Sequence, residues 1–240
     1  MKPIELILTS LNAALYASIG YLTFLGIFTP IIGVVRFWGI PVVVPAVFAV
    51  LFGPLVGGIG AAIGIFLSDM IIHGNALLSL AVGVPANFVM FYLIGLISKT
   101  KYKAKFPQST TILGSLAIAL VFLLSWFIGQ SSGLYMASIF LFFGTLCVAL
   151  LFLFERYWPK WKKFAFASII GNGIGSAIVG LGVWAFSQFF MLPGNLGSNL
   201  PITTSLIWFG WTFSNQMPFL LILCPPILRV CYRIFPKIIT

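Results

Sequence analysis

Asp69 and His73 are the only aspartate and the only histidine of the chain, and they stand four positions apart in an apolar stretch. Residues four apart share one face of an α-helix, so these two side chains are expected to lie next to each other. An ionised group in a membrane span costs about 2.5–3.5 kcal/mol at the bilayer centre, and it normally faces a cavity or a partner. The pair therefore predicts a polar patch at the mouth of a binding pocket.

Arg36 is expected at a similar depth, in an apolar loop that also contains Trp38. Two interpretations of Arg36 stay open. In the first, it forms a structural ion pair with Asp69 that fixes the loop. In the second, its planar guanidinium binds a carboxylate or phosphate of a ligand.

Isolated amides and tryptophans extend the candidate site. A mostly apolar cavity with a few amides and aromatic planes suits a small organic ligand. The alternative is that the amides join helices and the tryptophans form an interfacial belt. The predicted substrate-binding residues are Arg36, Trp38, Asp69, His73, Asn75, Asn87, Trp126, Asn172 and Asn215.

Catalytic motifs are missing from the sequence. It has no carboxylate pair, no metal-ligand spacing and no phosphate-binding Gly-Lys loop, so we expect no enzymatic activity, metal or cofactor. An alternative is a membrane enzyme that acts on lipid through Asp69 and His73. The sequence also has no ATP-binding motif, so active transport would draw its energy from an ion gradient or a partner subunit.

The composition identifies the class of protein. Of 240 residues, 61% are hydrophobic and 7% are charged, and the mean hydropathy is +1.15. Such a chain is expected to be an all-α, polytopic membrane protein, with residues 1–240 forming one integral domain in contact with lipid. Its net charge of +10 comes from short basic clusters beside apolar runs. That placement sets membrane topology, so nucleic acid is not an expected partner.

Eight apolar runs are present, and most of them reach the roughly 20 residues that cross a bilayer. The second is short and contains Pro41 and Pro45, so it is expected to be kinked or to span only partly. A six-span arrangement requires two runs that do not cross the membrane. The runs cover residues 5–28, 37–53, 54–73, 76–98, 109–130, 135–156, 165–191 and 203–228.

The basic residues test this count. With eight spans and a cytoplasmic amino terminus, every Lys and Arg except Arg36 falls on the cytoplasmic side. The positive-inside rule thus predicts a multi-pass protein of the cell membrane with both termini in the cytoplasm.

Small residues form a row along the third run and another on the first. Small side chains let helices approach closely, either in a tight crossing within the protein or as a smooth face for a partner. The residues predicted for a partner-docking face are Ala13, Ala17, Gly57, Gly60, Ala61 and Gly64.

Three of these motifs together resemble a known family. Gly53-Pro54-Leu55-Val56-Gly57 precedes the small-residue helix that ends at Asp69, and Ala13-Ala14-Leu15-Tyr16-Ala17 and Gly83-Val84-Pro85-Ala86-Asn87 flank it along the chain. This pattern, over roughly residues 5–98, resembles the substrate-binding S components of energy-coupling factor (ECF) transporters. Those proteins typically have six helices, and residues 99–240, with runs five to eight, carry no motif that matches them.

The resemblance implies a function. An S component captures a vitamin or similar micronutrient and docks on a coupling transmembrane subunit that is driven by two ATPases. By that resemblance, the small-residue faces would be the docking surface and an outer loop would act as a lid. The alternative, which belongs to another class of function, is that the chain is a non-transporting structural subunit of a larger membrane complex.

Overall fold

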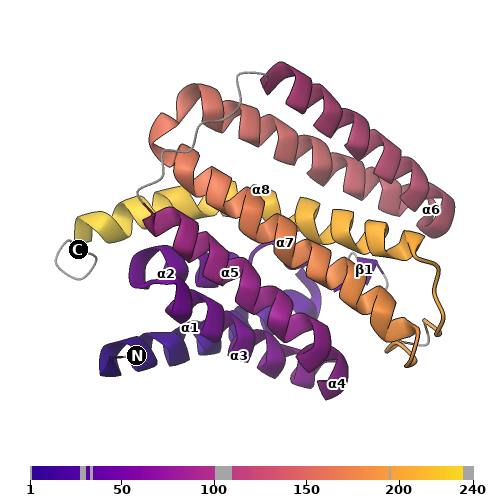
Figure 1. Cartoon of the computed structure of the whole chain (residues 1–240), viewed down its shortest axis with the longest axis horizontal. Helices are drawn as coiled ribbons and strands as arrows, with labels where there is room; N and C mark the ends of the chain where they lie inside the picture. Colours follow the sequence, from indigo (N-terminus) through magenta and orange to yellow (C-terminus); the bar gives the residue numbers. More distant parts are fainter. Residues whose placement is uncertain (1, 28–30, 33–34, 101–109, 195, 235–240) are drawn as a thin grey trace.

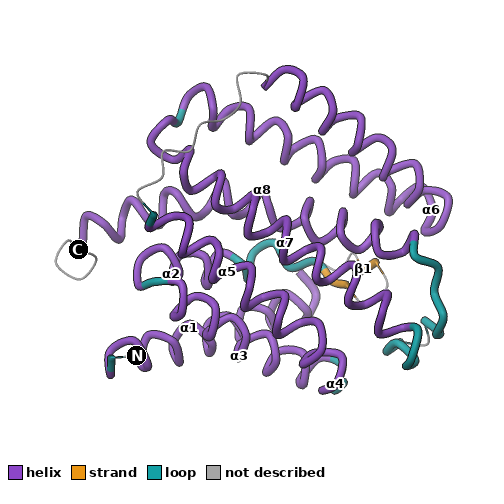
Figure 2. Tube along the Cα trace, viewed as in Figure 1, coloured by secondary structure: helices purple, strands orange, loops and turns teal. Residues whose placement is uncertain are grey.

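The computed structural model describes residues 2–27, 31–32, 35–100, 110–194 and 196–234, although not every side chain in η1, the two strands, α6 and η3. Helices make up almost all of this structure, apart from one short antiparallel strand pair (Figures 1 and 2). The elements are α1 (Pro3–Leu22), η1 (Thr23–Ile27), β1 (Ile31–Ile32), β2 (Val35–Arg36), α2 (Val43–Phe52), α3 (Pro54–Ile72), α4 (Ala76–Leu78), η2 (Ser79–Gly83), α5 (Val84–Lys99), α6 (Thr110–Tyr157), η3 (Pro159–Trp161), α7 (Lys162–Ser187) and α8 (Thr203–Ile234).

Six helical segments in the described part are long and apolar enough to cross a membrane, which confirms the prediction of an all-α polytopic membrane protein. They are Pro3–Leu25, Pro54–Ile72, Ala76–Lys99, Ala137–Phe154, Lys162–Ser187 and Thr203–Ile234. Their outer surfaces expose large apolar side chains, such as Ile71 and Leu181. Such side chains suit contact with lipid acyl chains.

The second predicted run is too short to cross as a helix. α2 has 10 residues, about 15 Å long, which is half of a hydrocarbon core of about 30 Å. The chain becomes helical only at Val43, after a turn that contains Pro41. At the other end of α2, Gly53 adopts a φ of 120°, which glycine tolerates, and Pro54 begins α3.

α6 folds back on itself. A Cβ placed on Gly129 would lie 3.4 Å from the Cβ of Ala137, whereas eight residues of straight helix span about 12 Å. Figure 1 shows the two arms, which meet at the right-hand end of the view. The predicted runs 109–130 and 135–156 correspond to these arms.

The N-terminal end of α1 and the C-terminal end of α8 lie at the same end of the bundle, on the left in Figure 1, with the α6–α7 junction and the C-terminal end of α5. The strand pair, α4 and the α7–α8 connection lie toward the opposite end. Between the ends, α3 packs against α1 and α5, and α7 packs against α5 and α8.

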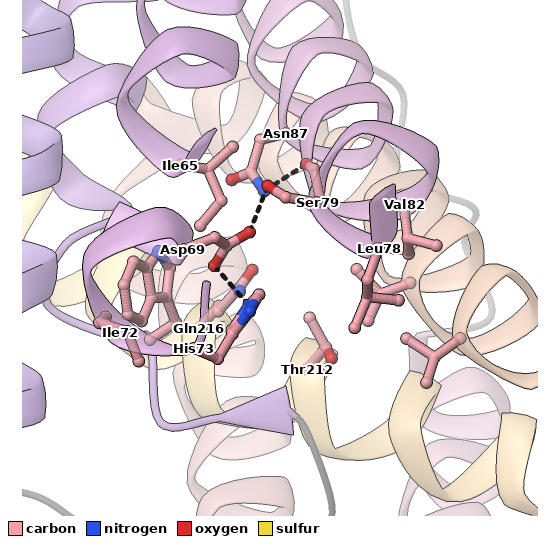
Figure 3. A pocket seen from close by; sticks show the side chains of 14 residues that line it. Ile65, Asp69, Ile72, His73, Leu78, Ser79, Val82, Asn87, Thr212 and Gln216 are labelled. Carbon is pink, nitrogen blue, oxygen red and sulfur yellow. Dashed lines mark hydrogen bonds and ion pairs between the residues drawn. The ribbon is translucent and has the colours of Figure 1, made fainter. Parts of the chain in front are cut away.

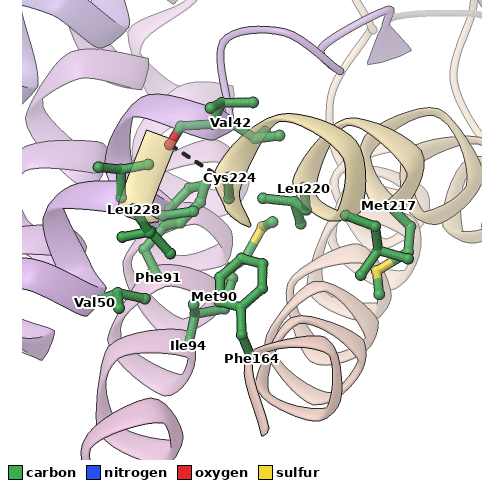
Figure 4. Close-up of a cluster of buried hydrophobic side chains, with 14 of the residues drawn as sticks. Val42, Val50, Met90, Phe91, Ile94, Phe164, Met217, Leu220, Cys224 and Leu228 are labelled. Carbon is green, nitrogen blue, oxygen red and sulfur yellow. Dashed lines mark hydrogen bonds between the residues drawn. The ribbon is translucent and has the colours of Figure 1, made fainter. Parts of the chain in front are cut away.

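The main core lies where α2, α5, α7 and α8 meet (Figure 4). Phe91, Ile94, Leu220 and Leu228 have no exposed surface there. Cys224 is buried among them and is a free thiol, as expected for a cysteine used in packing.

The small-residue face is part of this internal packing, which corrects the expectation that it docks a partner. Ala13, Ala17, Gly57, Gly60, Ala61 and Gly64 are all buried. A Cβ on Gly60 would lie 2.3 Å from Asn12 Nδ2, one on Gly64 would lie 2.8 Å from the Ala13 carbonyl oxygen, and one on Gly57 would lie 2.3 Å from Ala49 Cβ. α1 and α2 therefore cover the face that the glycines of α3 leave open.

Candidate functional site

A cavity of about 110 Å³ lies between α3, η2, α5, α7 and α8 (Figure 3). Its lining is mostly apolar and includes Ile65, Leu78, Val82 and Val183. Six polar side chains also line it, and they are Asp69, His73, Ser79, Asn87, Thr212 and Gln216.

Asp69 connects α3 to the following helices. Its Oδ2 accepts a hydrogen bond of 2.6 Å from the Ser79 hydroxyl, and its Oδ1 lies 3.4 Å from His73 Nε2. His73 Nδ1 accepts a hydrogen bond from the backbone N–H of Asn75. The proton of a neutral imidazole therefore sits on Nε2, facing the carboxylate.

Asn75 stabilises the same corner from outside the cavity. Its Oδ1 accepts a hydrogen bond of 2.9 Å from the Leu78 N–H and so caps α4. The structure thus brings Asp69, His73 and Asn75 together, although Asn75 does not line the cavity.

Trp38 forms a wall of the cavity and belongs to the segment before α2. Its indole Nε1–H donates to Tyr16 Oη at 2.7 Å, and the Tyr16 hydroxyl donates to Asn87 Oδ1 at 2.6 Å. The backbone N–H of Trp38 donates to Asn215 Oδ1 at 3.1 Å. Asn215 therefore fixes a wall of the cavity without lining it.

Two predicted residues lie away from the cavity, which corrects their assignment. Trp126 lies on the first arm of α6 with 69% of its surface exposed. Asn172 is buried between α7 and α8, where its Nδ2 donates to the Phe213 carbonyl oxygen at 3.1 Å. It therefore joins two helices, as the alternative interpretation of the amides expected. The backbone of Arg36 lies in β2, and its side chain is outside the described part, so both interpretations of Arg36 stay predictions.

Ser79, Thr212 and Gln216 were not among the predicted site residues. Thr212 Oγ1 and Gln216 Oε1 are buried without a hydrogen-bond partner in the described structure, and both residues are more than nine-tenths buried. The available signal was their spacing, because polar residues four apart in an apolar helix share one face. The same spacing separates Asn75 from Ser79.

The arrangement suits binding. One wall carries the Asp69 carboxylate with its two partners, and α8 contributes two oxygens without partners. A buried polar atom without a partner costs about 1–3 kcal/mol, and a ligand group that pairs with it recovers that cost. The apolar walls can enclose the rest of a small molecule.

Replacing Thr212 with valine is expected to leave the ligand-free protein as stable as before, or slightly more stable. Valine has nearly the same shape and removes a hydroxyl that has no partner. The matched control is Thr9→Val, because the buried Thr9 hydroxyl donates to the Glu5 carbonyl oxygen at 2.7 Å. Thermal unfolding in detergent should show a lower Tm for Thr9→Val and no decrease for Thr212→Val. A decrease in Tm for Thr212→Val larger than that for Thr9→Val would contradict the finding that the Thr212 hydroxyl has no partner.

Known proteins add no constraint to this geometry: no protein-family model matches the chain, and no curated protein or solved structure is found to match it.

Proposed function

We propose that this chain is the substrate-binding subunit of an ECF-type membrane transporter and captures a vitamin or similar small organic micronutrient in the cavity beside Asp69. The observation that carries the proposal is that Thr212 and Gln216, which line the same cavity as Asp69, each bury an oxygen that has no partner in the described structure. Natural interiors pair nearly all buried polar groups, so two unpaired oxygens on residues of one cavity lining support a ligand-binding role.

The resemblance to S components is supported by where its motifs lie. Tyr16 from the first motif, Asp69 from the second, and Gly83 and Asn87 from the third lie at or next to one cavity. Three segments that are far apart in sequence thus contribute residues to one site.

The chemistry of the described lining favours a neutral or positively charged ligand with hydrogen-bond donors. Asp69 is the only acidic residue in that lining, and no Lys or Arg belongs to it. Gln216 Oε1 and Asp69 accept hydrogen bonds, and the Thr212 hydroxyl can accept or donate. An amine or an amino-substituted heterocycle meets these requirements.

Membrane orientation and partners are part of the proposal. The basic clusters support cytoplasmic termini, which would put the cavity toward the outer surface. The energy for uptake would come from a coupling transmembrane subunit and two ATPase subunits.

A ligand screen tests the binding function. The purified protein is heated with vitamins, nucleobases and small amines, and one chemical class is expected to raise Tm. A ligand at one hundred times its Kd stabilises the folded state by about 2.7 kcal/mol, which is readily measured. A failure of all classes to raise Tm would contradict the proposed binding.

Isolation from native membranes tests the transport assignment separately. Co-purification of ATPase subunits is the expected result. A stoichiometric complex without ATPases would support the alternative of a non-transporting subunit.

A further inference from the structure

A second cavity, of about 730 Å³, lies at the end of the bundle that holds the N-terminal end of α1 and the C-terminal end of α8. It is formed by the C-terminal end of α5, the junction between α6 and α7, and the C-terminal part of α8. No described residue lines both this cavity and the one beside Asp69. Its chemistry is therefore a separate question from that of the proposed micronutrient.

The charge of this cavity is positive. Lys160, Lys163 and Arg229 line it, and no acidic residue does so in the described structure. Lys163 donates to the Thr100 carbonyl oxygen, whereas neither Lys160 nor Arg229 has a partner among the described residues. Three cations in a concave site whose described lining holds no counter-charge attract an anion.

One further polar residue belongs to the lining. Ser98 lines the cavity, and its hydroxyl oxygen is buried and has no hydrogen bond in the described structure. A hydroxyl can donate to an anionic oxygen, so Ser98 and the cations are matched to one type of ligand group.

The remaining surroundings are those of the membrane–water interface. Five of the described lining residues are aromatic, and four of these are tryptophan or tyrosine: Tyr157, Trp158, Trp161 and Tyr232. Tryptophan and tyrosine typically lie at the headgroup level of a bilayer. Nearby on the same helices, Leu153 of α6 and Val230 of α8 expose apolar side chains suited to acyl chains. A ligand with an anionic head and apolar chains fits both the basic cavity and the exposed apolar side chains beside it.

We infer that this cavity binds the phosphate headgroup of an anionic phospholipid. Lys160 and Arg229 neutralise the phosphate, and Ser98 donates a hydrogen bond to it. The guanidinium of Arg229 matches phosphate oxygens in geometry, and the Lys160 ammonium acts as a point charge. Basic pockets between membrane helices are suited to lipid headgroups.

Thermal unfolding in mixed micelles tests the inference. Added phosphatidylglycerol is expected to raise Tm by about 2–4 °C more than added phosphatidylcholine. The double variant K160Q/R229Q should lose most of this difference. The matched control is K162Q/R233Q, which removes the same charge from the same two helical regions but from residues that do not line the cavity.

Three results would overturn the inference. Phosphatidylcholine could stabilise the wild-type protein equally well, or the control variant could lose as much as K160Q/R229Q. The third is that inorganic phosphate reproduces the whole effect, which would identify a site for free phosphate. None of these results bears on whether the cavity beside Asp69 binds a micronutrient.

Discussion

Valine in place of Gly171 is expected to destabilise the folded protein by about 3 kcal/mol, near the upper end of typical overpacking effects. A Cβ on Gly171 would lie 2.6 Å from Ile94 Cγ1 and 2.7 Å from the Met90 carbonyl oxygen. The second neighbour is backbone, which cannot rotate away, so α5 and α7 would have to separate. Thermal unfolding of the purified variant measures the loss.

Gly173 provides the matched control for this prediction. It lies two residues further along α7, and a Cβ built on it would meet nothing within 4 Å. Gly173→Val should therefore change stability by less than about 1 kcal/mol, the scale of helix propensity. If Gly171→Val does not fold, Gly171→Ala adds only the Cβ, and its smaller loss of stability can still be measured by thermal unfolding. Equal effects at Gly171 and Gly173 would show that α5 and α7 do not cross closely at Gly171.

Asparagine in place of Asp69 is expected to weaken binding of the compound selected in the screen by about 10- to 100-fold. A hydrogen bond to a charged group contributes about 1.5–3 kcal/mol, and asparagine removes the charge while preserving the shape. The asparagine carbonyl oxygen can still accept from Ser79, so the link between α3 and η2 is retained. Titration of the purified protein with the compound measures the change in Kd.

Glu5→Gln is the control for this loss of negative charge. The Glu5 carboxylate lies at the amino-terminal end of α1 and accepts a hydrogen bond from the Lys2 N–H, far from the cavity lining. Its replacement should leave Kd unchanged. If Asp69→Asn left Kd unchanged, the Asp69 carboxylate would not take part in binding the compound. If Glu5→Gln weakened binding as much as Asp69→Asn, the effect would come from the change in net charge rather than from a contact with the ligand.

Several features followed from local sequence alone. The apolar composition determined the membrane class, because such a chain cannot hide so much apolar surface in water. Pro41 and Pro45 indicated that the second run would be interrupted, and α2 has only 10 residues. Asp69 and His73 were expected to be neighbours because helix periodicity brings residues four apart together, and they lie 3.4 Å apart.

Which face of each helix turns inward was decided only by the tertiary structure. In a soluble protein, the apolar side of a helix marks the core, but a membrane helix is apolar both toward lipid and toward its neighbours. The sequence therefore did not separate Trp126, which is largely exposed, from Trp38, which forms a wall of the cavity. For the same reason, the row of small residues around Gly60 had two interpretations, and contact with α1 selected internal packing.

The candidate site shows the same division. The sequence determined that an acid and a histidine lie together near the end of one helix, since that follows from helical spacing. Only the packing of α8 against α7 and α2 brings Thr212 and Gln216 to the cavity beside Asp69, which lies more than 130 residues away along the chain. Contacts over such a distance depend on how whole helices are rotated and stacked, and hydrophobic periodicity carries no information about that in a bilayer.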